Sequence, residues 1–387
     1  MPAPVHLTAQ AERRLKSGHL WIFAHELVGV RPEMHGNIVR VNDSRGNFFA
    51  HGFYSAKSRI AVRILNRDSL LPDRSFFAQA VRAATQKRAG KIGPGRAVRL
   101  VNSEGDLLPG LVVDWYAGQA VLQCLIPGVD KLKEMFAELI EEEYKPEGLW
   151  FRNDASIRET EELPLEKFFW RGAEKKEVVV DEGGLKFAIN IIEGHKTGSY
   201  LDQAGNHLAA EKYARGRALD AFCFSGGFAL HLARKAEEVV ALDSSQPALA
   251  ALEKNIELNG LRNIKPVRGD IFALLPELVK AGEKYSLVVI DPPPFAKSRK
   301  DLAAAAKGYY ELNRRALSLL VPGGILMTYS CSHHFGLADL IDTVQKAGAD
   351  LGRQTRLIEI QTQASDHPIL LSTPETWYLK GLVAEVA

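Results

Sequence analysis

Residues 219–228 constrain the fold of this chain more than any other stretch. They read Leu-Asp-Ala-Phe-Cys-Phe-Ser-Gly-Gly-Phe, an apolar run broken by a glycine pair and followed by an amphipathic helical pattern. A strand, a glycine turn and a helix in this order place backbone N–H groups and a positive helix end at the carboxyl edge of a sheet, where open α/β folds bind nucleotide-like ligands. A glycine pair after a strand can also be explained by tight packing between strand and helix. This stretch alone therefore predicts a strand–turn–helix unit but does not establish a ligand site.

The charges around this turn favour one class of ligand. A second predicted strand ends in Asp243, close to the roughly 20-residue spacing at which an acid reaches a ribose hydroxyl. The loop lacks the Gly-x-Gly-x-x-Gly pattern of pyrophosphate sites, and Asp220 at the tip of the first strand repels phosphate. S-adenosylmethionine, which carries an ammonium, a sulfonium and a ribose, therefore fits this pattern better than NAD.

The overall composition limits the class of protein. At 387 residues the chain is long enough for two or three domains. The N-terminus lacks a basic-then-apolar leader, and no apolar run approaches the roughly 18 residues of a membrane span. Cys124, Cys223 and Cys331 are too far apart for a disulfide framework or a CxxC zinc site. We therefore expect a cytoplasmic protein with no membrane and no metal partner.

The first predicted domain, residues 1–72, is β-rich and basic. It holds ten Lys or Arg against five Asp or Glu, a net charge of +5 in a chain whose net charge is only +2. This excess indicates contact with a polyanion, although an ordinary solvated surface can have the same composition. The segments Lys-Ser-Gly-His-Leu-Trp-Ile-Phe at 16–23 and Gly-Phe-Tyr at 52–54 resemble a PUA domain, and that resemblance implies RNA binding.

The second predicted domain, residues 73–172, is of α+β type and shows no catalytic constellation. Its expected helices are 75–90 and about 130–144, and its expected strands are 97–101, 110–116, 120–125 and 148–152. Beyond it, the polar loop at 193–203 precedes the glycine-containing strand. That loop is either a plain solvated connection or a lid over the cofactor.

The third predicted domain, residues 173–387, has the regular alternation of a doubly wound sheet. Strands are expected at about 217–222, 238–243, 264–268, 285–290 and 324–330, and helices at about 227–236, 246–259, 271–281, 302–320 and 337–350. Two late strands, 357–360 and 377–384, are expected to form an antiparallel edge pair. The fold class is therefore α/β, with a Rossmann-like sheet preceded by a small β-rich domain and an α+β domain.

Three further polar signals end strands at the same edge of this sheet. Asp270 follows the third strand, where it can accept from an adenine amino group or cap the next helix. Asp291 begins an Asp-Pro-Pro-Pro-Phe run, whose prolines cannot continue a sheet and fix the acid over the crevice. Cys331 closes the fifth strand among polar residues, at a place suited to a nucleophile.

Taken together, the motifs resemble one family along essentially the whole chain. They are Lys-Thr-Gly-x-x-Leu-Asp-Gln at 196–203, Asp-x-Phe-x-x-x-Gly-Gly at 220–227, Asp-Pro-Pro-x-Phe at 291–295, Ser-Cys-Ser at 330–332, Asp-His-Pro at 366–368 and Pro-Glu-x-x-Tyr-Leu-Lys-Gly at 374–381. The chain is similar to the PUA-containing ribosomal RNA large-subunit methyltransferase I family, class I enzymes that methylate C5 of cytosine. The resemblance implies S-adenosylmethionine as cofactor and RNA, 23S ribosomal RNA in particular, as partner.

The same resemblance implies roles for individual residues. Cys331 matches the nucleophile, and Asp291 matches the acid that holds the cytosine. The implied cofactor-binding residues are Gln203, Asp220, Phe222, Ser225, Gly226, Gly227, Asp243, Ser244, Asp270 and Asp291. Pro294 departs from the pattern of other RNA cytosine-C5 methyltransferase families, many of which have a second cysteine there, so the base that removes the C5 proton is not assigned.

Two other functions stay open at this point. A methyltransferase of exocyclic amines on guanine or adenine also uses an acidic Pro-Pro loop but needs no cysteine. A non-catalytic RNA-binding protein could retain the same scaffold, although the joint presence of Asp243, Asp291 and Cys331 argues against it. The sequence does not fix the oligomeric state, and a homodimer is one candidate.

Overall fold

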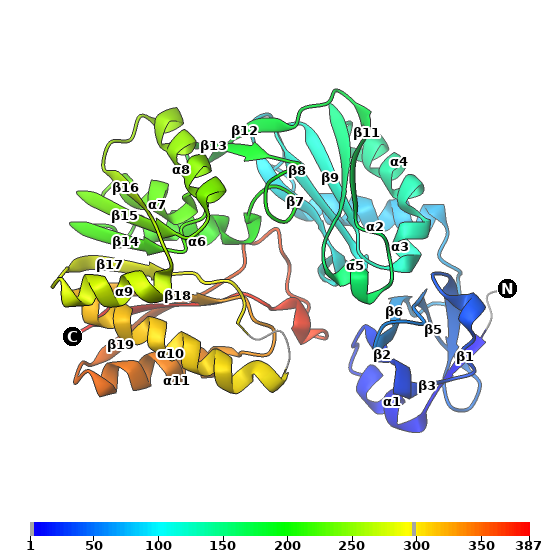
Figure 1. The fold of residues 1–387 in the computed structure, drawn as a ribbon. Helices are drawn as coiled ribbons and strands as arrows, with labels where there is room; N and C mark the ends of the chain where they lie inside the picture. Colours follow the sequence, from blue (N-terminus) through cyan, green and yellow to red (C-terminus); the bar gives the residue numbers. More distant parts are fainter. Residues whose placement is uncertain (1–3, 296–298) are drawn as a thin grey trace. The chain divides into compact units, whose positions relative to one another are not determined.

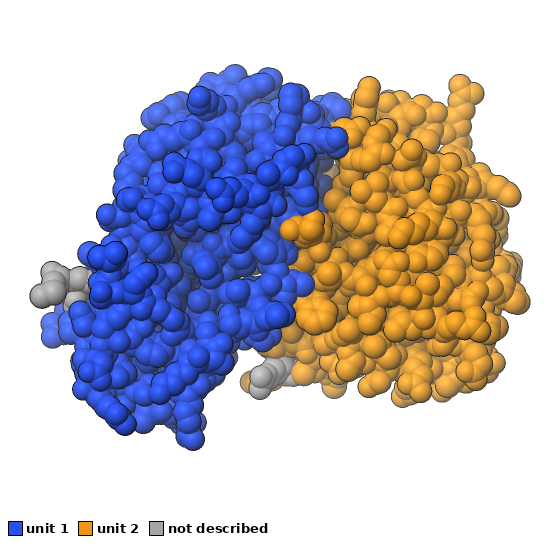
Figure 2. Space-filling model, turned by 180° about the vertical axis from the view of Figure 1, so that it is seen from behind, with its two compact units in different colours: residues 1–180, 189–201, 366–376 blue, residues 181–188, 202–365, 377–387 orange. Residues whose placement is uncertain are grey.

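The computed structural model describes residues 4–295 and 299–387 and divides into two compact units (Figure 2). Unit 1 comprises Met1–Val180, Ile189–Leu201 and Asp366–Thr376. Unit 2 comprises Asp181–Ala188, Asp202–Ser365 and Trp377–Ala387. The chain therefore passes between the units several times, and unit 1 includes a segment from near the C-terminus.

The first part of unit 1 is a six-stranded sheet in the order β2-β6-β5-β4-β1-β3. Its elements are β1 (Pro4–Leu7), α1 (Ala9–Leu15), β2 (Trp21–Phe23), β3 (Leu27–Val28), β4 (Ile38–Asn42), β5 (Phe48–Tyr54) and β6 (Ile60–Asn66). Side chains alternate between the two faces of a strand, and β4 accordingly sends Val39 and Val41 into a core where each is at most 1% exposed. The predicted β-rich module is confirmed as a sheet with its own core.

The second part of unit 1 is a five-stranded sheet in the order β11-β10-β9-β8-β7. Its strands are β7 (Ala97–Asn102), β8 (Leu111–Tyr116), β9 (Gln119–Cys124), β10 (Gly148–Asn153) and β11 (Glu166–Gly172), and its helices are α2 (Arg74–Lys87), α3 (Pro127–Lys131), α4 (Lys133–Tyr144) and α5 (Ile157–Thr160). Helices α2 and α4 join through the rings of Phe77 and Phe136, whose centroids are 5.2 Å apart in the core of this sheet. The hairpin β12 (Glu177–Glu182) and β13 (Leu185–Asn190) follows.

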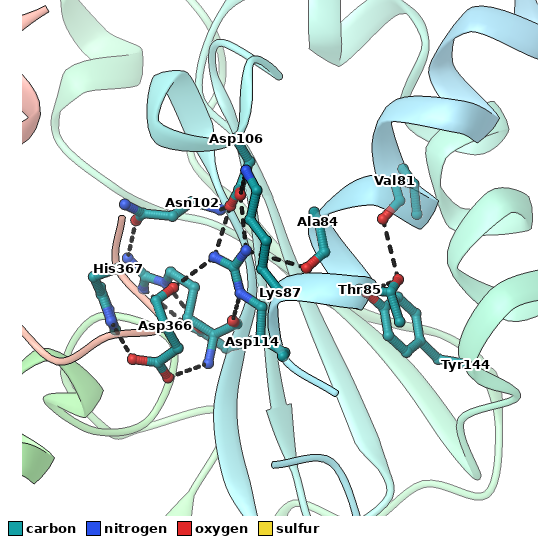
Figure 3. Close-up of polar contacts among 12 residues, drawn as sticks. Val81, Ala84, Thr85, Lys87, Asn102, Asp106, Asp114, Tyr144, Asp366 and His367 are labelled. Atoms are coloured by element: carbon teal, nitrogen blue, oxygen red, sulfur yellow. Dashed lines mark hydrogen bonds and ion pairs between the residues drawn. The ribbon is translucent and has the colours of Figure 1, made fainter. Parts of the chain in front are cut away.

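A buried polar network anchors the C-terminal segment of unit 1 (Figure 3). Arg88 donates to both carboxylate oxygens of Asp106 at 2.7 Å and to the backbone carbonyl of Asp366 at 2.6 Å. The Asp366 carboxylate accepts from the backbone N–H of Arg99 at 2.9 Å and shares a 2.8 Å hydrogen bond with Nδ1 of His367. Buried charges need such partners, so removing any one of these groups would leave another unpaired.

Unit 2 is built on a seven-stranded sheet in the order β16-β15-β14-β17-β18-β20-β19. Its strands are β14 (Arg217–Ala221), β15 (Glu238–Asp243), β16 (Ile264–Arg268), β17 (Tyr285–Ile290), β18 (Leu320–Ser330), β19 (Thr355–Thr362) and β20 (Lys380–Val386). The first five in sequence pair in parallel, whereas β20 pairs antiparallel with β18 and β19. The predicted doubly wound sheet with an antiparallel edge pair is confirmed, and its strand order reverses beside β14.

Helices cover both faces of this sheet (Figure 1). One face carries α6 (Ala204–Ala210), α7 (Gly227–Ala233) and α8 (Gln246–Asn259), and the other carries α9 (Ile271–Lys280), α10 (Leu302–Leu319) and α11 (Leu337–Asp350). Tyr309 on α10 and Leu340 on α11 are fully buried in the core against the strands. Within the described ranges, no helix combines the length and apolar character needed to cross a bilayer.

Candidate active site

The predicted site residues meet at the carboxyl edge of the sheet in unit 2. Asp220 lies on β14, Asp243 ends β15, and Asp291 and Cys331 directly follow β17 and β18. These strands lie in the order β15-β14-β17-β18, so their ends are neighbours. Asp220 is within electrostatic range of both other acids. Three carboxyl groups and a thiol therefore share one stretch of sheet edge.

The turn after β14 has a strained backbone. Phe222 and Phe224 have φ angles of 68° and 48°, a region that costs residues with a side chain about 1–3 kcal/mol each. Asp243 stabilises the turn, because its Oδ2 accepts a hydrogen bond from the N–H of Phe224 at 2.9 Å. Strain of this kind concentrates at ligand sites, and here it lies between the strand that carries Asp220 and helix α7.

The glycine pair in this turn is required by packing. Gly226 has a φ of 91°, and a Cβ there would lie 2.4 Å from Cδ1 of Leu252. A Cβ on Gly227 would lie 2.3 Å from the ring of His207. Glu182 holds that ring through a 2.8 Å hydrogen bond to Nδ1. Packing alone therefore explains both glycines, and the evidence for a ligand comes from the acids beside them.

Asp220 is a buried acid that lacks a hydrogen-bond partner among the described residues. The residue is 1% exposed, and neither carboxylate oxygen is hydrogen-bonded. Burial raises the pKa of Asp220 to about 8, and charge repulsion from Asp291 adds to this increase. The backbone N–H of Ala229 lowers the pKa by a smaller amount, although it does not form a hydrogen bond with the carboxylate. An unpaired buried carboxyl group is costly, so this site suits a cationic ligand that would pair with it.

The other predicted cofactor residues lie near the ends of the neighbouring strands β14, β15 and β16. Each oxygen of Asp243 accepts one backbone hydrogen bond, from Phe224 at 2.9 Å and from Ser245 at 2.8 Å, which leaves acceptor capacity for a ribose hydroxyl. Asp270 caps α9, because its Oδ1 accepts from the N–H of Phe272 at 3.0 Å. Among the remaining predicted residues, Phe222, Ser225 and Gly226 lie between β14 and α7, Gly227 begins α7, and Ser244 follows β15.

Gln203, which the sequence assigned to the cofactor, contacts Asp291. Its Nε2 donates to Oδ2 of Asp291 at 2.9 Å, and its Oε1 accepts from Nδ2 of Asn206 at 2.6 Å. Gln203 is 3% exposed, and Asn206 fixes which way its amide points. Gln203 therefore orients the acid of the Asp-Pro-Pro loop.

Cys331 is the most accessible of the three cysteines. It is partly exposed, whereas Cys124 and Cys223 are buried. Burial raises the pKa of both buried thiols, which disfavours their thiolate forms. The Sγ of Cys331 lies 4.0 Å from the carbonyl oxygen of Pro292. Cys331 is thus the thiol that lies beside the loop of Asp291.

Two of the motifs make their contacts in unit 1. Asp366 and His367 belong to the buried arginine network described above. Thr197, from the 193–203 loop, is buried, donates to Oδ2 of Asp114 at 2.5 Å and shares a 2.8 Å hydrogen bond with the hydroxyl of Tyr116. That part of the loop is therefore anchored to β8 and is not a freely solvated connection.

Two residues beside Cys331 were given no role by the sequence reasoning, although Lys380 belongs to the 374–381 motif. Lys380 is buried and donates from Nζ to the carbonyl of Ser332 at 2.7 Å. The hydroxyl of Tyr309 lies 3.4 Å from Oγ of Ser332. The sequence does hold one indication of a role for Lys380, because a lysine begins the otherwise apolar strand Lys-Gly-Leu-Val-Ala.

Comparisons with known proteins match this chain to two families of domains. Residues 5–67 match the model of a PUA-like domain, and residues 164–360 match that of an S-adenosylmethionine-dependent methyltransferase. Proteins named ribosomal RNA large subunit methyltransferase I are each 38% identical to this chain: one from Aeromonas hydrophila over 99% of both chains, and one from Photobacterium profundum over 100% of both.

Solved structures show the same fold at low sequence identity. A methyltransferase complexed with SAH superposes with a TM-score of 0.87 at 17% identity, over 99% of this chain and 100% of that chain. A methyltransferase from Streptococcus mutans gives a TM-score of 0.85 at 18% identity, with the same coverage. Likeness at this level of identity bears on the fold alone.

Proposed function

Because the chain belongs to the ribosomal RNA large subunit methyltransferase I family of S-adenosylmethionine-dependent methyltransferases, we propose that it methylates C5 of a cytosine in 23S ribosomal RNA. The observation that carries the C5 assignment is the 4.0 Å distance between Sγ of Cys331 and the carbonyl of Pro292. This distance brings a partly exposed thiol beside the loop that begins with Asp291, at the sheet edge that also carries Asp220 and Asp243. Methylation of an exocyclic amine needs no such thiol.

The matched family confirms the predicted cofactor. When bound, S-adenosylmethionine supplies an electrophilic methyl group on a sulfonium. Asp220 and Asp243 are the residues that we assign to hold it, Asp220 through charge and Asp243 through acceptor oxygens. The backbone of the Phe222–Gly227 turn would line the same edge.

Cys331 supplies the activation that cytosine needs, because C5 is too weak a nucleophile to take a methyl group directly. The thiolate of Cys331 forms a bond to C6, and the C5–C6 electron pair moves to C5. C5 takes the methyl group, a base then removes the C5 proton, and those electrons restore the C5–C6 double bond as the C6–S bond breaks. The thiolate is regenerated, so one cysteine serves every turnover.

We assign Asp291 to the edge of the cytosine ring that carries N3 and N4, across the ring from C6. As charge builds on the ring during attack at C6, a carboxyl group near N3 or N4 stabilises it. Gln203 holds one carboxylate oxygen of Asp291 at 2.9 Å, which fixes the direction of the acid before the base enters. Such preorganisation avoids reorganisation during the reaction.

Nucleoside mass spectrometry tests the proposed reaction. Large-subunit RNA from a strain that lacks the protein is analysed before and after treatment with the purified chain and S-adenosylmethionine. We expect the treatment to add one 5-methylcytidine. A methylated guanine or adenine amine would support the exocyclic-amine alternative, and an unmodified RNA would support a non-catalytic binding role.

Cofactor binding should release a proton near pH 7. Burial raises the pKa of Asp220 to about 8, so its protonated form is favoured at pH 7. A bound cation favours the carboxylate, so affinity should rise as pH increases, by up to tenfold per unit, and level off above about pH 8. Calorimetry in two buffers of different ionisation enthalpy counts the protons released, and Asp220→Asn serves as the control for titration of the ligand itself. Equal proton release by wild type and Asp220→Asn would contradict this assignment.

The basic N-terminal module should contribute salt-dependent RNA affinity. Arg13, Lys16 and Arg59 are exposed there, and no ion pair joins them to an acid among the described residues. Replacing all three with serine should lower the slope of log affinity against log salt by about 2, because each phosphate contact on single strands contributes about 0.7.

Filter binding over a salt series measures that slope. The control is a triple serine variant of exposed basic residues in unit 2, which are Arg262, Lys265 and Lys280. The control should keep the wild-type slope. If the two triple variants lose the same amount, the module has no special role in RNA binding.

Three broader proposals accompany this function. The protein works in the cytoplasm, where ribosomal RNA is its substrate. The chain has three domains, which are residues 1–72, 73–172 and 173–387. A homodimer through the edge strand β19 is the candidate assembly, because Leu357, Ile358 and Ile360 are each 45–49% exposed there and an apolar strand edge favours pairing.

A further inference from the structure

Lys380 occupies a position in unit 2 that is unusual for a lysine. It begins β20, where it lies opposite Ser330 on β18 and Thr362 on β19, and it is 4% exposed. Its Nζ donates to the carbonyl of Ser332 at 2.7 Å and to the carbonyl of Tyr378 at 3.0 Å. Both hydrogen-bond acceptors are backbone carbonyls, so a buried ammonium group is held by neutral partners. Lysine is seldom buried so completely without a carboxylate.

The titratable groups near Lys380 include Cys331, which lies in the loop after β18. Cys331 and Asp339 are the titratable groups that act on the ammonium by charge, Cys331 the more strongly. The ring of His333, two residues after Cys331, has its centroid 6.0 Å from that of Tyr378. Burial lowers the pKa of Lys380 to about 8, and the charges of Cys331 and Asp339 oppose that shift. The ammonium form of Lys380 therefore still predominates at pH 7.

We propose that Lys380 is a positioning residue that favours the thiolate of Cys331 and fixes the loop that presents it. The proposal rests on the function of Cys331 proposed above. Lys380 and Ser332 join the end of β18 to the start of β20, so the hydrogen bond at 2.7 Å sets where the loop leaves the sheet. The ammonium then supplies the positive charge that a thiol needs to ionise near neutral pH.

The size of the effect follows from ordinary electrostatics. An opposite charge in close range shifts the pKa of an ionisable group by about 1–3 units, and the thiol of a free cysteine titrates near pH 8.5. Removing the charge of Lys380 should therefore raise the midpoint for ionisation of Cys331 by about one unit. At pH 7 this corresponds to a roughly tenfold slower reaction of the thiol with an electrophile.

The test measures alkylation of Cys331 in the full-length protein without RNA. Iodoacetamide is added at a series of pH values from 6 to 10, and the peptide that contains Cys331 is followed by mass spectrometry. The variants are Lys380→Gln, which keeps an amide donor but loses the charge, Lys380→Met, a second variant without charge, and Lys380→Arg, which keeps the charge. The control is Lys284→Met. Lys284 is an exposed residue directly before β17, and its Nζ also donates to a backbone carbonyl, that of Ser318, at 2.8 Å.

We expect the midpoint to rise by about one unit in Lys380→Gln and Lys380→Met and to stay near the wild-type value in Lys380→Arg and Lys284→Met. S-adenosylmethionine binding by calorimetry confirms that each variant is folded. If Lys380→Gln or Lys380→Met is folded and Cys331 still ionises at the wild-type midpoint, the proposal is overturned. Methylation by Cys331→Ala is scored separately: if it persists while the midpoint still follows Lys380, the C5 mechanism fails and the electrostatic assignment stands.

Discussion

Replacing Cys331 with alanine should reduce RNA methylation by at least about 10⁴-fold while leaving S-adenosylmethionine affinity unchanged. The loss is large because the base receives no activation at C5 without a thiolate at C6. The affinity is kept because Asp220 and Asp243, not the thiol, are assigned to the cofactor. Transfer of a radioactive methyl group to RNA measures the activity, and calorimetry measures the affinity.

The other two cysteines are the internal controls for that variant. Cys124 lies in the core of the five-stranded sheet, and Cys223 lies in the turn after β14, each at most 4% exposed. Cys124→Ala and Cys223→Ala should remain active, with a stability cost of about 1–2 kcal/mol from the lost packing. If Cys331→Ala keeps activity comparable to theirs, the thiol has no part in the reaction and the exocyclic-amine alternative is preferred.

Replacing Asp291 with asparagine should lower the rate of methylation by about 10²–10³-fold, the range seen when one group that stabilises transition-state charge is removed. The substitution conserves the shape of the side chain. It removes the acid that Gln203 orients at 2.9 Å, and the carbonyl of the next residue, Pro292, lies 4.0 Å from Sγ of Cys331. Single-turnover methylation at saturating RNA isolates this step from binding.

Two companion variants make the Asp291 result specific. Gln203→Ala removes the orienting hydrogen bond but keeps the acid, so its loss should be smaller, about tenfold. Asp342→Asn removes an exposed acid from α11 of the same unit and should have no effect. A wild-type rate for Asp291→Asn would remove the acid from the mechanism, whatever the result for Cys331.

Local sequence pattern was enough to predict much of the fold. The bounds of α8 and α11 agree with those expected, because both helices have a regular apolar face and a clear beginning and end. Helix α6 was missed, since its sequence Ala-Gly-Asn-His-Leu-Ala-Ala has a glycine at the second position and follows a polar loop. The antiparallel edge was expected, although β19 and β20 begin and end two to three residues away from the expected limits.

The parts of the site that pattern could not predict depend on contacts between distant residues. Gln203 and Asp291 are 88 positions apart, and only the fold brings the amide to the acid. Lys380 belongs to the 374–381 motif, but only the pairing of β20 with β18 and β19 shows where its buried side chain lies. Asp366 is bound by Arg88 across 278 positions, so its motif gave no indication that it belongs to the other unit. The roles assigned to Cys331 and to the cofactor residues stay predictions.

Trapping the covalent adduct tests the central claim most directly. An RNA that carries 5-fluorocytosine at the target has no C5 proton to lose, so the bond between the base and the attacking thiol cannot break after methyl transfer. The account predicts a protein–RNA species that survives a denaturing gel, requires S-adenosylmethionine and maps by mass spectrometry to the peptide of Cys331. It also predicts the same species in Cys124→Ala and Cys223→Ala. An adduct that forms equally well in Cys331→Ala, or no adduct in a wild-type protein that methylates the unfluorinated RNA, would contradict it.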